Sequence, residues 1–167
     1  DISKVQSGAE QMQCERIDTC TLVRQALGEQ DKAIAESRLT LKVNIPDHEV
    51  PIWADGKKMS RVMENLLGNC IKYAMTGTRV FVTVSEQEGE AVIELKNIAN
   101  YEMDFDAAEI TERFVRGDAA RTTEGSGLGL AIAKSYVMAC GGTLAVDVDG
   151  DLFKVRITFP VYGVQPA

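Results

Sequence analysis

The stretch from Arg61 to Tyr73 constrains this sequence more than any other. Apolar residues recur at steps of three and four, which predicts a helix with one face in a core: Met59, Val62, Met63, Leu66, Leu67, Cys70 and Ala74. A row of amides and cations runs beside them: Arg61, Asn65, Asn69 and Lys72. Asn carbonyls can ligate Mg²⁺, and cations bind phosphate, so this row favours a site for a polyphosphate and its metal. A solvated polar face is the alternative.

The composition is that of one globular domain. The chain has 167 residues, of which 45% are hydrophobic and 26% charged, and a net charge of −7 that argues against nucleic acid as the main partner. No apolar run approaches the ~20 residues that span a membrane, and no signal peptide opens the sequence. The four cysteines form no Cys-x-x-Cys pair, which argues against a zinc site or a disulfide framework and indicates a reducing compartment.

Periodicity predicts an alternation of helices and strands. We expect residues 1–15 to be the tail of a preceding helix and a linker, with the polar stretch Gln13 to Asp18 as linker, and residues 16–167 to form one domain. Helices are expected over 19–36, 56–75 and 128–140, and strands over 39–45, 50–54, 79–86, 91–97, 143–148 and 152–159. Asp55 is expected to cap the central helix, and the single histidine, His48, to be exposed.

Two further features favour a nucleotide. Asn97 shares a strand face with apolar residues, so its amide needs a partner: either a turn, as a strand-end cap, or a base. The glycine-rich segment 125–130 leads into a helix, where free N–H groups and the helix dipole favour phosphate. It matches neither a Walker loop nor a dinucleotide fingerprint. The irregular segment 99–124 between them is expected to be a mobile lid.

The order of these parts resembles the ATP-binding catalytic domain of sensor histidine kinases, in the GHKL superfamily. Asn65 to Tyr73 looks like its N box, Glu112 to Asp118 like its F box, and Gly125 to Leu130 like its second glycine box. The resemblance implies the Bergerat fold, an α/β two-layer sandwich in which a mixed sheet of about five strands carries three helices on one face.

The resemblance also implies functional residues, with ATP and Mg²⁺ as cofactors. It implies catalytic roles for Asn65, Lys72 and Arg116, and Asn69 as the metal ligand. The implied nucleotide-binding residues are Asn65, Asn69, Lys72, Tyr73, Asn97, Arg116, Gly125, Gly127, Leu128 and Gly129. Phosphate would pass to a histidine on upstream dimerisation helices of the same protein and then to a response regulator. Such proteins are homodimers, with this domain in the cytoplasm and an anchor in the membrane.

Two departures leave other functions open. The family's first glycine box, Asp-x-Gly-x-Gly, is absent, and Asn97 stands where its aspartate would accept a hydrogen bond from adenine. This change is compatible with a degenerate, pseudo-kinase module that acts through protein contacts. Asn65 stands where ATP-hydrolysing members carry a Glu general base, which argues against a free-standing ATPase.

Overall fold

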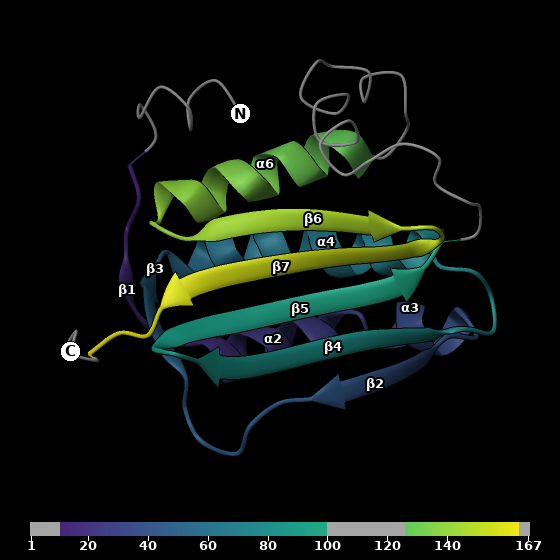
Figure 1. The fold of residues 1–167 in the computed structure, drawn as a ribbon, viewed down its shortest axis with the longest axis horizontal. Coiled ribbons are helices and arrows are strands. Elements are labelled where there is room, and N and C mark those ends of the chain that lie inside the picture. The colour runs from purple at the N-terminus through teal and green to yellow at the C-terminus, as the bar shows by residue number, and fades with distance from the viewer. Residues whose placement is uncertain (1–10, 100–125, 164–167) are drawn as a thin grey trace.

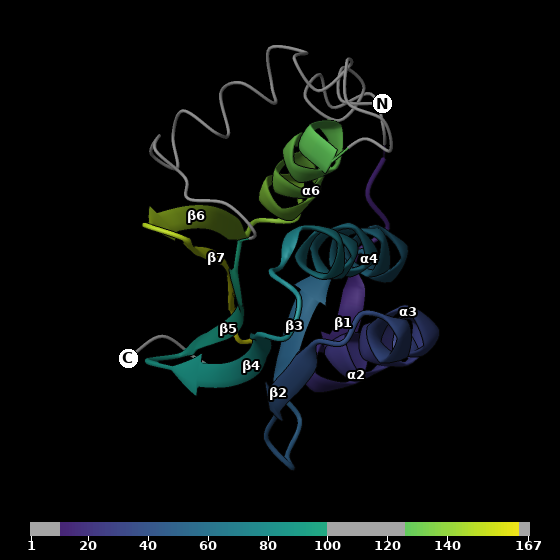
Figure 2. The ribbon, with the colours of Figure 1, turned by 90° about the vertical axis from the view of Figure 1, so that its right-hand side faces the viewer.

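A mixed five-stranded sheet with helices packed on one face forms this domain (Figures 1 and 2). The computed structural model describes residues 11–99 and 126–163. The helices are α2 (Thr19–Glu29), α3 (Asp31–Glu36), α4 (Gly56–Tyr73) and α6 (Ser126–Ala139). The strands are β1 (Glu15–Asp18), β2 (Thr40–Asn44), β3 (Pro51–Ala54), β4 (Arg79–Gln87), β5 (Glu90–Ile98), β6 (Thr143–Asp149) and β7 (Leu152–Pro160).

The large sheet has the order β2-β4-β5-β7-β6, in which only the β2–β4 pair is parallel. Its two hairpins are the predicted ones. In the first, Glu88 and Gly89 both have positive φ, the backbone of a tight turn whose twist matches the strands. Helices α2, α4 and α6 lie side by side on one face, and the opposite face is bare of helices in Figure 2. The predicted two-layer α/β fold is confirmed.

The core lies between the helices and the sheet. Each apolar residue of the α4 stripe is buried, from Met59 to Ala74. Facing them are Val80, Val82, Ile93 and Leu95, whose alternation in β4 and β5 puts every second side chain on this face. Burying one such side chain stabilises the folded state by roughly 1.5–3 kcal/mol. Any rotation of α4 about its axis, or shift away from the sheet, would expose several of them to water.

A second, two-stranded sheet pairs β1 with β3, with Glu15 opposite Ala54 and Asp18 opposite Pro51. The predicted linker over Gln13 to Asp18 is therefore wrong from Glu15 onward. This short strand carries a single apolar residue, Ile17, so its sequence shows no alternation. The strand expected over 50–54 is present but lies outside the main sheet.

The helix expected over 19–36 is two helices. The chain breaks at Gln30, whose φ of −99° and ψ of 7° leave the helical range. The apolar positions continue through the break in Ala33 and Ile34, so periodicity alone did not reveal it.

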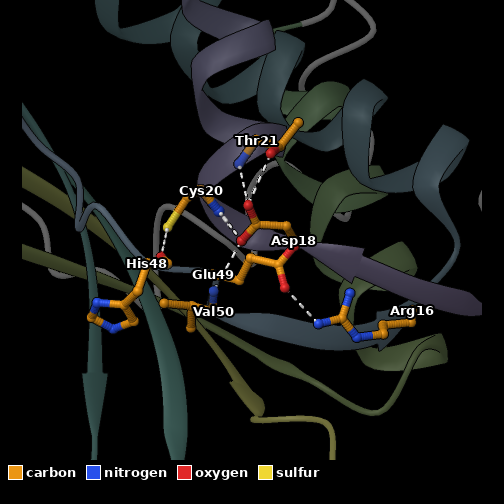
Figure 3. Close-up of polar contacts among 7 residues, drawn as sticks. All are labelled: Arg16, Asp18, Cys20, Thr21, His48, Glu49 and Val50. Carbon is orange, nitrogen blue, oxygen red and sulfur yellow. Dashed lines mark hydrogen bonds and ion pairs between the residues drawn. The ribbon is translucent and has the colours of Figure 1, made fainter.

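Asp18 fixes the start of α2 (Figure 3). Its carboxylate accepts hydrogen bonds from the backbone N–H groups of Cys20 and Thr21, from the Thr21 hydroxyl, and from the backbone N–H of Val50 at 2.9 Å. Burial alone would raise its pKa, but these four hydrogen bonds outweigh burial and leave the pKa below its usual value. One carboxylate therefore joins the helix start to the chain entering β3. His48, nearby, is exposed as predicted.

Candidate functional site

The C-terminal half of α4 carries the predicted amide row. Asn65 and Asn69 are half-buried, and Lys72 is exposed. The positions of all three side chains are set by the rotation of α4, which the buried apolar stripe fixes. The Asp55 carboxylate caps the start of the helix by accepting a hydrogen bond from the Lys58 N–H at 3.1 Å. The two amides thus lie at the border between core and surface, where they are ordered but remain accessible to a ligand.

Asn97 lies on the core-facing side of β5, as expected, and only 3% of it is exposed. It pairs in register with Val80 on one side and Phe153 on the other. An amide in this position ordinarily has a partner, because leaving its hydrogen bonds unmade costs about 1–3 kcal/mol.

The end of α4 is joined to the end of β5. Ala74 forms a bridge with Ala99, and the Met75 N–H donates to the Ile98 carbonyl at 2.7 Å. In Figure 1, β5 ends at the same side of the molecule as α4. This connection brings the predicted residues Tyr73 and Asn97 to one end of the fold. The Lys72 ammonium lies 5.3 Å from the centre of the Tyr73 ring, a cation–π contact.

Helix α6 begins at Ser126, two residues before the expected start, so that Gly127, Leu128 and Gly129 form its first turn. The first four N–H groups of a helix have no partner within it, and they carry its positive dipole end. Helix α6 packs against α4. The start of α6, with its positive dipole end, therefore lies at the end of the fold that also holds the amide row (Figure 1).

One contact between these helices was not predicted. Tyr136 of α6 is buried, its hydroxyl accepts a hydrogen bond from the Arg61 guanidinium at 3.4 Å, and the Lys58 ammonium lies 5.0 Å from its ring centre. Arg61, which the helical spacing placed in the polar row, is thus bonded to α6. The two residues are 75 positions apart, and no local pattern in the sequence links them.

Some predicted residues lie outside the described ranges. These are Arg116, Gly125 and the segment expected to be a lid, residues 99–124 apart from Ala99. The residues that are described contain no cluster of three or more His, Cys, Asp or Glu side chains arranged to hold a metal. An Mg²⁺ bound through amide oxygens, as Asn69 implies, would not require one. None of the described helices is both long and apolar enough to cross a membrane.

Comparison with known proteins agrees with this arrangement. The model of the family described as "Histidine kinase-, DNA gyrase B-, and HSP90-like ATPase" matches residues 54–163. The chain is 34% identical over 122 residues to the sensor histidine kinase WalK of Bacillus subtilis, covering 70% of this chain and 20% of WalK. Against RppB of Synechocystis it is 31% identical over 133 residues, covering 77% and 29%. The chain thus spans less than a third of these curated relatives.

Solved structures share the fold. The catalytic domain of histidine kinase ThkA superposes with a TM-score of 0.76 at 16% identity, covering 90% of this chain and 97% of that one. The mycobacterial sensor histidine kinase MprB gives 0.70 at 25% identity, covering 87% and 96%. The resemblance inferred from the three sequence boxes is therefore confirmed. The matched segment contains α4, Asn97 and α6, and the chain belongs to the histidine kinase-, DNA gyrase B- and HSP90-like ATPase family, as an ATP-binding catalytic domain of the histidine kinase type.

Proposed function

We propose that this chain is the kinase module of a two-component sensor and transfers the γ-phosphoryl group of Mg²⁺–ATP to a histidine on upstream dimerisation helices. The observation that supports this most is the convergence of three features at one end of the fold: the α4 amide row, the buried amide of Asn97, and the start of α6. Each suits one part of the nucleotide. Together they offer a hard oxygen ligand, a base-binding amide and an anion-binding helix end.

In this proposal each residue has one role. Asn69, with Asn65 beside it, holds Mg²⁺, which when bound neutralises phosphate charge. Lys72 and Arg116 bind the phosphates, and the N–H groups of residues 127–129 cradle them. Tyr73 packs near the ribose or base. Phosphoryl transfer of this kind depends mainly on positioning and charge neutralisation, which matches a site that offers donors and cations.

The rest of the protein is inferred from the family. The acceptor histidine would lie on helices that precede residue 16, in a homodimer, and the phosphoryl group would pass on to a response regulator. The domain would work in the cytoplasm of a cell whose membrane anchors the full-length protein. A pseudo-kinase that binds nucleotide weakly is the second candidate. It is favoured by Asn97 and by the missing first glycine box.

Isothermal titration calorimetry with ADP and a non-hydrolysable ATP analogue tests the metal role. We expect affinity to fall by about tenfold, or 1.4 kcal/mol, both when EDTA removes Mg²⁺ and in Asn69→Ala, with no further loss when the two are combined. Asn44→Ala, which removes an exposed amide on β2, is the control and should bind as the parent does. Equal affinity in all samples would disprove the metal role of Asn69, and no binding in any would favour the pseudo-kinase.

A further inference from the structure

Two cysteines far apart in the sequence, Cys14 and Cys140, lie near Asp55. Cys14 stands one position beyond the Glu15–Ala54 pair in the antiparallel β1–β3 register, which brings it next to Asp55. The Gln13 N–H donates to the Asp55 carboxylate at 2.9 Å and fixes this segment. Cys140 directly follows α6, one helical turn after Tyr136, whose ring lies 5.0 Å from the Lys58 ammonium near the start of α4. This places Cys140 close to Asp55 as well, and the Cys14 sulfur is among the groups that raise the pKa of the Cys140 thiol. In Figure 1 the chain entering β1 and the C-terminal end of α6 lie at the same side of the molecule.

These two thiols differ from the other two. Cys14 and Cys140 are only half-buried, so a small reagent can reach them. Cys20 and Cys70 are buried, and burial raises the pKa of Cys70 to about 12. A thiol that is both buried and protonated is unreactive, because the thiolate is the nucleophile. Cys14 and Cys140 are therefore the two cysteines that are both accessible and close to each other. They lie at the opposite end of α6 from the glycine-rich turn.

We propose that Cys14 and Cys140 are a redox-sensitive site, at which a disulfide joins the segment before β1 to the end of α6. The oxidant is a low-molecular-weight disulfide such as oxidised glutathione. The Cys14 thiolate attacks one of its sulfurs, which forms a mixed disulfide and releases one thiol. Cys140 then loses its proton to solvent and attacks the Cys14 sulfur, which releases the second thiol. Two protein thiols lose two electrons and two protons, and the reagent disulfide becomes two thiols.

The order of attack follows from the surroundings of Cys140. Burial, and then the neighbouring Cys14 sulfur, raise the pKa of Cys140 to about 11, so near neutral pH it is a thiol and a poor first nucleophile. The mixed disulfide is on the same chain, so the second step is intramolecular, and proximity offsets the small thiolate fraction. The resulting bond would enclose almost the whole domain in one covalent loop, a length at which cross-links restrict the unfolded chain strongly.

The test equilibrates the purified chain with glutathione buffers of increasing oxidised fraction, quenches it with acid and alkylates it in denaturant, so that every free thiol reacts. Intact mass and peptide mapping follow. We expect the four alkylatable cysteines to fall to two, with one linked peptide pair containing Cys14 and Cys140 in a monomeric chain. The unfolding midpoint should rise on oxidation. In Cys14→Ser and Cys140→Ser the linked pair and the rise in midpoint should both be lost. Cys20→Ala, at a buried thiol, is the control and should keep both.

Three outcomes would overturn the proposal. One is a parent chain that keeps four alkylatable thiols in buffers that oxidise dithiothreitol. Another is an end state of glutathione adducts without a protein disulfide. The third is a bond between two chains or between any other cysteines. Because the parent chain alone decides among these outcomes, a variant that fails to fold does not affect the test.

Discussion

At the scale of single residues, the affinity for nucleotide depends most on Asn97. Its amide is buried on the core side of β5. An amide oxygen can accept from the adenine amino group, and the NH₂ group can donate to a ring nitrogen. A carboxylate in the same place would make a charge-assisted bond to the amino group, which is roughly twice as strong as a neutral one.

Asn97→Asp should therefore tighten binding of ADP by about fivefold, the equivalent of ~1 kcal/mol. Asn97→Leu, which keeps the volume and removes the polar atoms, should weaken it by at least as much. Calorimetry at constant Mg²⁺ measures both. Asn44→Asp makes the same change of charge on the exposed edge strand β2 and should leave affinity unchanged. If Asn97→Leu bound ADP as well as the parent does, Asn97 would be a structural residue without a role in base recognition.

At the scale of elements, two carboxylates determine where helices start. Asp55 caps α4, and Asp18 caps α2 while also binding the Val50 N–H. Both are aspartates, a residue type that favours the N-cap position, and each stands a few residues before an apolar periodic run, but only Asp55 was predicted. For Asp18, the residues after it were expected to form a helix and the residues before it a linker. The strand β1 that places its carboxylate carries no period-two pattern.

The Asp18 cap predicts a dependence of stability on pH. Its pKa is lowered in the folded state by the bonds from Val50, Thr21 and Cys20, against the opposing effect of burial. The stabilisation is therefore present above the unfolded pKa of about 3.9 and is lost as pH falls through the lower folded value. Asp18→Asn should lower the free energy of unfolding by about 1–2 kcal/mol at pH 7 and by little at the acid end.

Thermal or urea unfolding of parent and variant across pH 2.5–7 (about the range in which carboxylates titrate) measures this effect. Asp31→Asn is the control, because Asp31 opens α3 without a side-chain cap and is exposed. The prediction fails if the stability difference between Asp18→Asn and the parent stays constant over the whole range.

At the scale of the molecule, local patterns predicted the elements, and the structure adds the pairings between distant ones. The hairpins β4–β5 and β6–β7 follow from their turns. The central β5–β7 pairing joins hairpins separated by the segment 99–142, and the β1–β3 pairing joins strands of four residues each. Such contacts depend on tertiary packing and leave no periodic trace. The row on α4 was predictable because it follows from a local helical period, whereas the Arg61–Tyr136 hydrogen bond joins residues 75 positions apart and was not.

The whole domain should bind ATP without turning it over quickly. Hydrolysis needs a base that activates water, and general bases contribute about 10²–10⁴-fold in rate. The place such a base takes in ATP-hydrolysing relatives holds Asn65, which is half-buried and neutral, and Glu64 points about 100° away around the helix. The only histidine of this chain, His48, is exposed in the loop before β3 and bears no relation to the α4 row.

Incubation with γ-labelled ATP should therefore release phosphate no faster than in the Asn69→Ala variant, and no acid-labile label should appear on His48. Asn65→Glu should raise the rate of release by about tenfold or more if the missing base is what limits it. Glu64→Gln, which removes the neighbouring carboxylate and leaves the row intact, should change nothing. Fast release by the parent chain that Glu64→Gln abolishes would make Glu64 the base and the domain an ATPase, because a kinase module must retain the γ-phosphoryl group for its acceptor histidine.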